Sequence, residues 1–153
     1  MSLSIQGSSG AGAGILFPDG TTQPSAARFG QTVSVAINAR YALSNSSFGG
    51  VGPTISITPS STSSKILIQA TLSIQYQAYS FLTFLRNGTN VSNARGITSY
   101  NAASSWTNAV LRYVDSPSST SSVTYQLGVW GNIYLNDYSA GNYSQIILTE
   151  ILP

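Results

Sequence analysis

The chain contains neither cysteine nor histidine. Without cysteine it can form no disulfide and can carry out no thiol chemistry. Without histidine it lacks the commonest general base, the commonest metal ligand and the usual switch near neutral pH. These two absences exclude the most frequent types of hydrolytic and metal site, and they favour a structural or binding protein over an enzyme.

Charged residues are also scarce. They make up 7% of the chain, against about 25% in an ordinary globular domain. The pI near 9.0 rests on a net charge of only +2. The arginines are scattered and Lys65 is the only lysine, so no basic stripe is present to neutralise phosphates. We therefore expect no nucleic-acid partner.

No long hydrophobic run is present. No apolar stretch approaches the roughly 20 residues of a membrane span, and the first residues lack the basic and apolar regions of a secretory signal. We expect neither membrane insertion nor a secretory signal. Solubility must come from uncharged polar side chains.

One hexapeptide, Pro-Ser-Ser-Thr-Ser-Ser, occurs twice, at residues 59–64 and 117–122. Each copy lies between two apolar, strand-like runs. Proline fixes φ and lacks an N–H, and the hydroxyls that follow can hydrogen-bond to their own backbone. The repeat therefore predicts two uncharged turns between strands.

Hydrophobic residues alternate with polar ones along most of the chain after residue 31, which indicates β-strands. Asn87-Gly88 predicts a tight hairpin after residues 82–85. About eight or nine strands are expected, with turn clusters at roughly 8–12-residue spacing and no helical period. The sequence predicts an all-β fold, an antiparallel β-sandwich of jelly-roll type. The expected strands include residues 32–37, 54–58, 66–74, 109–114, 123–130, 133–138 and 145–152.

Residues 1–30 are expected to form an extended N-terminal arm, and residues 31–153 the β-sandwich domain. A Gly-rich stretch at residues 7–14 is followed by Ile15, Leu16 and Phe17 and then by the turn signal Pro-Asp-Gly. An isolated arm cannot bury three bulky apolar side chains. We expect them to dock on the body of the protein or on another subunit.

The last expected strand is apolar on both alternations, apart from Thr149 and Glu150. A strand of this kind is either central in a sheet or part of a subunit interface. Both readings stay open. Under the second, Ile147 and Ile151 are the candidate interface residues.

Few residues could carry chemistry. Asp115 and Asp137 are the only plausible carboxylate pair for glycoside hydrolysis, but each has an ordinary role as a turn or loop residue. Asp19 or Asp137 could hold a weak calcium ion with oxygen ligands. No phosphate-binding or dinucleotide motif is present. We expect no catalytic activity and no cofactor.

Aromatic residues are the remaining functional signal. Trp106, Asn136, Tyr138 and Tyr143 could stack on and hydrogen-bond a host-surface glycan. Alternatively, the tyrosine rings are half-buried strand residues, because tyrosine is common in strands.

Four segments resemble structural proteins of tailed bacteriophages. Residues 14–23 are similar to the FPDGTTQ element of many phage tail-fibre sequences. Residues 56–68 resemble a strand–turn–strand segment of β-rich fibre and virion-surface domains. Residues 115–122 and the Ile-Leu-Thr-Glu-Ile ending resemble the later part of the same domain. The resemblance implies a non-enzymatic protein of the virion exterior, usually a homotrimer.

The resemblance has one departure, which is length. About thirty residues precede the β-domain, which is too short for a fibre shaft. We therefore expect a capsid decoration (cement) protein that docks by its arm on the major capsid protein, or on a tail or adaptor protein. The alternative is a receptor-binding tail-fibre knob that recognises host glycan.

Overall fold

A computed structural model of the chain describes residues 15–16, 22–23, 29–100, 106–136 and 143–153. Every regular element in these residues is a β-strand. The strands are β1 (Ile15–Leu16), β2 (Thr22–Gln23), β3 (Phe29–Ile37), β4 (Tyr41–Ile57), β5 (Lys65–Tyr76), β6 (Ser80–Arg86), β7 (Thr89–Asn90), β8 (Thr98–Tyr100), β9 (Trp106–Asp115), β10 (Val123–Leu135) and β11 (Ser144–Ile151).

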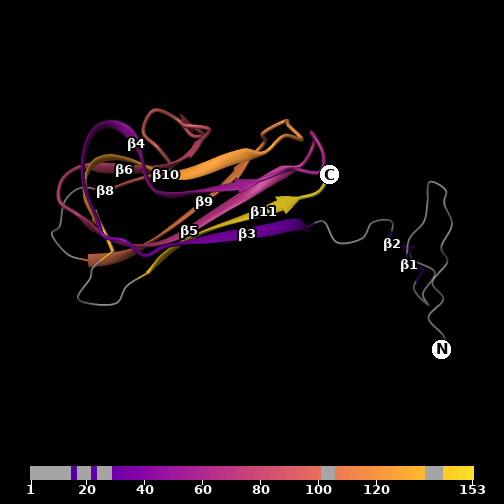
Figure 1. Cartoon of the computed structure of the whole chain (residues 1–153), viewed down its shortest axis with the longest axis horizontal. Helices are drawn as coiled ribbons and strands as arrows, with labels where there is room; N and C mark the ends of the chain where they lie inside the picture. Colours follow the sequence, from indigo (N-terminus) through magenta and orange to yellow (C-terminus); the bar gives the residue numbers. More distant parts are fainter. Residues whose placement is uncertain (1–14, 17–21, 24–28, 101–105, 137–142) are drawn as a thin grey trace.

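Nine strands, β3 to β11, form one antiparallel sheet that folds into two layers. One layer has the order β3-β11-β5-β9, and in the other β10 lies between β4 and β6, with β7 and β8 paired to β6. The layers are joined where β10 also pairs with the end of β5, at residues 133–135 and 74–76. Figure 1 shows β4, β6 and β10 over β3, β5 and β11. The expectation of an all-β antiparallel sandwich is confirmed.

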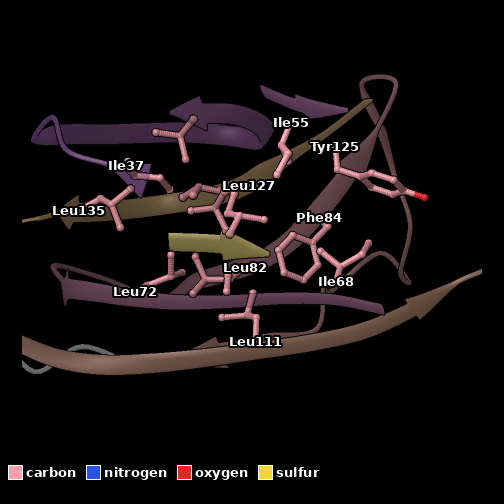
Figure 2. Close-up of a cluster of buried hydrophobic side chains, with 14 of the residues drawn as sticks. Ile37, Ile55, Ile68, Leu72, Leu82, Phe84, Leu111, Tyr125, Leu127 and Leu135 are labelled. Carbon is pink, nitrogen blue, oxygen red and sulfur yellow. The ribbon is translucent and has the colours of Figure 1, made fainter. Parts of the chain in front are cut away.

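The core lies between the two layers. Alternate residues of β5 point inward from one layer, and those of β6 and β10 point inward from the other. Figure 2 shows Ile68 and Leu72 of β5 near Leu82 and Phe84 of β6, all of them fully buried. Removing each such side chain from water stabilises the fold by about 1.5–3 kcal/mol. The period-two pattern of β5 in the sequence therefore identified the core correctly.

Both copies of the repeated hexapeptide connect one layer to the other. Residues 59–64 join β4 to β5, and residues 117–122 join β9 to β10. The same hydrogen bond forms in each copy: the Ser63 N–H donates to Ser61 Oγ at 3.1 Å, and the Ser121 N–H donates to Ser119 Oγ at 3.0 Å. The repeat is two uncharged turns, as predicted.

The hairpin signal is also confirmed. Asn87 and Gly88 both have positive φ, 48° and 82°, as a two-residue turn of type I′ requires. Arg86 pairs with Thr89 across it. The second strand of this hairpin, β7, is only two residues long.

Two strand assignments are wrong. Residues 123–130 and 133–138 were expected to be separate strands, but β10 runs unbroken from Val123 to Leu135. Gly131 has a φ of 106°, which glycine adopts readily, and it still pairs with Asn45 of β4. Neighbouring strands on both sides of β10 supply hydrogen bonds along it, and this pairing overrides the local turn signal.

The first part of β4 was not predicted at all. Its register against β10 shifts twice, because three residues of β4 lie opposite one residue of β10 between Ile55 and Val51, and again between Gly49 and Asn45. The Gln126 side chain donates to the carbonyl of Gly52 at 2.7 Å inside the first irregularity. Such bulges interrupt the alternation by which a strand is recognised in a sequence.

Candidate interaction surfaces

The outer face of the β3-β11-β5-β9 layer carries an apolar surface. Inward side chains are buried, so alternate positions on each strand point outward. Three of these outward side chains are largely exposed: Phe29 at 62%, Val110 at 60% and Val114 at 48%. We name this surface the β11 face; its apolar residues are Phe29, Leu67, Val110, Val114, Ile147 and Ile151.

The β11 face carries little charge. Arg112 lies beside Gln69 on it, and Lys65 lies beside Ile151. The carboxylates of Asp115 and Glu150 belong to inward positions of the same layer and are buried. Large, weakly charged apolar surfaces on soluble proteins mark contacts with other macromolecules.

The structure places two predicted interface residues on this face. β11 lies between β3 and β5, so its reading as a central strand is confirmed. Ile147 and Ile151 occupy its outward positions and are half-buried. The arm residues Ile15 and Leu16 form β1, which pairs with β2. Phe17 lies outside the described residues.

Three of the four predicted glycan residues, Trp106, Asn136 and Tyr143, each lie at or next to a contact of Ser73. Trp106 and Ser73 border a hollow of about 210 Å³ at the start of β9. The Ser73 N–H donates to Ser144 Oγ at 3.0 Å, and Tyr143, next in the chain, is 71% exposed. Tyr138 lies outside the described residues.

Asn136 does not fit a direct glycan contact. It is 2% exposed. Its amide donates to the carbonyls of Ile37 and Ala39, and its Oδ1 accepts a hydrogen bond from Ser144 Oγ at 2.6 Å. The interpretation of Asn136 as a glycan contact is therefore wrong. Its side chain makes hydrogen bonds that join the end of β10 to β3 and β11. The sequence around Asn136 is typical of a loop and does not indicate that its side chain is buried.

Asp115 has a structural role that its position before a turn did not indicate. It ends β9 with 7% exposure, and both of its carboxylate oxygens lie 3.0 Å from Arg86 Nη1. Tyr125 donates its hydroxyl to Asp115 Oδ2 at 2.6 Å. Burial, together with this hydrogen bond, raises the pKa of Tyr125 well above its usual value. Asp115, Arg86 and Tyr125 thus connect β9, β6 and β10. Asp137, the other carboxylate of the predicted pair, lies outside the described residues.

Glu150 is a buried carboxylate beneath the first repeat turn. It is 1% exposed. Its Oε1 accepts hydrogen bonds from the Ser60 N–H at 2.6 Å and Ser60 Oγ at 2.7 Å, and Oε2 accepts one from Gln31 Nε2 at 3.3 Å. Burial alone would raise the pKa of Glu150, but the hydrogen bonds outweigh it and lower the pKa to about 2. The carboxylate joins the last strand to the turn and to β3.

Sequence reasoning missed a set of aromatic rings on the outer side of the other layer. Tyr79 and Phe81 meet edge to face with ring centroids 5.1 Å apart, and Phe81 lies 5.1 Å from Trp130. Trp130 meets Phe48 at 5.8 Å. We name these four residues the aromatic ladder. The pairing of β4, β6 and β10 and the turn before β6 bring them together, so no spacing in the sequence could have revealed the ladder.

The two described side-chain carboxylates are held in hydrogen-bonded contacts between strands and turns, Asp115 by Arg86 and Tyr125 and Glu150 by Ser60 and Gln31. In the parts of the chain that the structure describes, no three acidic side chains gather where they could hold a metal ion. No helix among the described residues is long and apolar enough to cross a membrane. In comparisons with known proteins, no family model matches the chain and no curated protein matches it significantly.

Proposed function

We propose that this chain is a non-enzymatic structural protein of a tailed-phage particle, a capsid decoration protein on the virion exterior. It self-associates as a homotrimer through the β11 face and docks on the shell through residues 1–30. The observation that carries the proposal is the β11 face itself, which is apolar, exposed and nearly uncharged.

The size of the β11 face supports an occupant as large as another protein. Four strands about 4.8 Å apart and about nine residues long give a projected area of roughly 600 Å². A stable interface buries about 800 Å² on each partner. The face therefore supplies most of one such interface, and further contact must come from neighbouring segments.

The composition of the face favours a second copy of the chain as its occupant. Lys65 and Arg112 are its only charged residues in the described part of the chain, so two copies bring few charges into contact. Charged residues are depleted at the centres of protein interfaces. Ile147, in the middle of β11, is the residue on which such an interface would be centred.

A single substitution tests the oligomer. Ile147→Lys should convert a trimer into monomers with unchanged far-UV circular dichroism, because each copy would bury an unpaired ammonium group. Light scattering coupled to size exclusion measures the mass. Ser56→Lys, at an exposed position on the other layer, is the matched control and should stay trimeric. A trimeric Ile147→Lys variant or a monomeric wild type would contradict the proposal.

A deletion tests attachment. Removing residues 1–23 should leave a folded oligomer that no longer binds particles lacking the protein. Normal occupancy after this deletion would refute the role of the arm. If the protein is instead a receptor-binding knob of a tail fibre, it will be found on the tail in a map of the particle, and its loss will abolish adsorption to the host.

A further inference from the structure

A stripe of outward side chains runs along β10, on the layer opposite the β11 face. Ile133 is buried and points inward, so Trp130, Asn132 and Tyr134 share the outer side. Ser44 of β4 pairs with Asn132 there. A hollow of about 330 Å³ opens beside the stripe and is lined by Ala42, Leu43, Ser44, Gln77, Asn132, Ile133 and Tyr134.

The aromatic ladder continues this stripe. Trp130 belongs to both, and Tyr79, at the far end of the ladder, is 53% exposed. The rings hold one another edge to face or tilted, so they present aromatic surface that loses little conformational entropy when a ligand binds.

Hydrogen bonds to the backbone of β10 fix the hollow and the aromatic ladder relative to each other. The carbonyl of Asn132 accepts hydrogen bonds from the Gln77 N–H at 2.9 Å and from Ser80 Oγ at 3.1 Å. These bonds hold the turn between β5 and β6 against β10. Gly131 allows the close approach, because a Cβ there would lie 2.5 Å from the carbonyl oxygen of Tyr79. Gln77 and Tyr79 are thus fixed at the edge of the same stripe.

One positive charge lies beside Tyr134, which lines the hollow. The guanidinium of Arg40 lies over the ring of Tyr134, 4.8 Å from its centroid. Within the described ranges, the side-chain carboxylates are those of Asp115, which pairs with Arg86, and Glu150, which is held by Ser60 and Gln31. Neither neutralises Arg40. A guanidinium that is held in place by an aromatic ring is suited to bind a carboxylate through two hydrogen bonds.

The amide and hydroxyl groups of the hollow are unused. In the described part of the chain, the side chains of Ser44, Gln77 and Asn132 make no hydrogen bond to another residue, and all three are exposed. A set of polar donors and acceptors beside the exposed ring of Tyr79 and the half-buried ring of Trp130 matches the two faces of a sugar, its hydroxyl edge and its C–H face.

We propose that this surface binds an acidic oligosaccharide. A uronate unit lies in the hollow with its carboxylate on Arg40 and its hydroxyls on Ser44, Gln77 and Asn132. The next sugar stacks on Trp130 and Tyr79. The site is on the opposite layer from the β11 face and does not depend on the proposed trimer.

The probe is an array of uronate-bearing oligosaccharides, each paired with its methyl ester, and the full-length protein is applied to it. We expect binding to at least one acid and loss of binding to its ester, because esterification removes the charge but keeps the ring. Arg40→Gln should weaken binding by about 10- to 100-fold, since one charge-assisted hydrogen bond is worth about 1.5–3 kcal/mol. Tyr79→Ala should weaken it by a similar factor.

Matched controls locate the site. Arg112→Gln removes an exposed arginine from the other layer, and Tyr143→Ala removes an exposed tyrosine outside the proposed site. Both should bind like the wild type. Absence of binding to every acid, or equal binding to acids and esters, would overturn the proposal. Loss of binding in Tyr143→Ala or Trp106→Ala, with Arg40→Gln unaffected, would move the site to the hollow beside Ser73.

Discussion

The buried carboxylate of Glu150 should make the stability of the fold depend on pH in the acid range. Its pKa is about 2 in the folded protein, against 4.5 for a free side chain. A lowered folded pKa means that the group stabilises the fold above pH 4.5. That stabilisation is lost as the pH falls from 4.5 towards 2, where the folded carboxylate itself takes up a proton.

The pKa difference sets an upper limit on the effect. A displacement of about 2.5 pKa units is equivalent to about 3 kcal/mol. Ser60 is exposed at the surface of the turn, so solvent screens the carboxylate and reduces this figure. We expect Glu150→Gln to lower the free energy of unfolding at pH 7 by about 1–2 kcal/mol and to flatten the stability profile between pH 5 and 2.

Urea unfolding at several pH values measures both quantities. Ser60→Ala removes one hydroxyl donor to Glu150 and should cost about 1 kcal/mol. Ser118→Ala changes the equivalent residue of the second repeat, which makes no contact with a carboxylate in the described residues, and should cost less than about 0.5 kcal/mol. Equal stability and equal pH profiles for Glu150→Gln and wild type would refute this reasoning.

Three further substitutions test the other contacts. Tyr125→Phe removes the 2.6 Å hydrogen bond to Asp115 and should lower stability in urea by about 1.5–3 kcal/mol. Gly131→Ala should lower the melting temperature more than Gly88→Ala, because both residues have positive φ but only at Gly131 would the new Cβ collide with backbone atoms. Asn136→Ala leaves the buried carbonyl of Ile37 without its donor and should cost about 1–3 kcal/mol, whereas Asn132→Ala, at an exposed position, should unfold like the wild type.

The features that the sequence predicted correctly depend on short-range chemistry. The turn at Asn87-Gly88 could be predicted because asparagine and glycine tolerate positive φ better than other residues. The repeated turns follow from serine hydroxyls that accept a hydrogen bond from the backbone N–H two residues further along the chain. The buried alternation of β5 follows from the two-residue period of a strand. Each of these can be evaluated within a few residues of sequence.

The features that it missed depend on pairing between distant segments. Asp115 becomes buried because Arg86 and Tyr125 arrive from other strands. Asn136 becomes buried because the end of β3 and the start of β11 close over it. Nothing next to either residue in the chain carries that information. A polar residue beside a turn signal therefore looks exposed in a sequence whether or not the fold buries it.

The same limit explains why the two interaction surfaces differed in how easily they were found. The β11 face was indicated in advance because Ile147 and Ile151 break the polar outward alternation within one strand, a local signal. The stripe on β10 is assembled from β4, β10 and the turn between β5 and β6. Its residues are ordinary strand and turn residues when taken one at a time. Since the two surfaces lie on opposite layers, the proposed self-association through one leaves the other exposed, so the two proposals can be tested by separate substitutions.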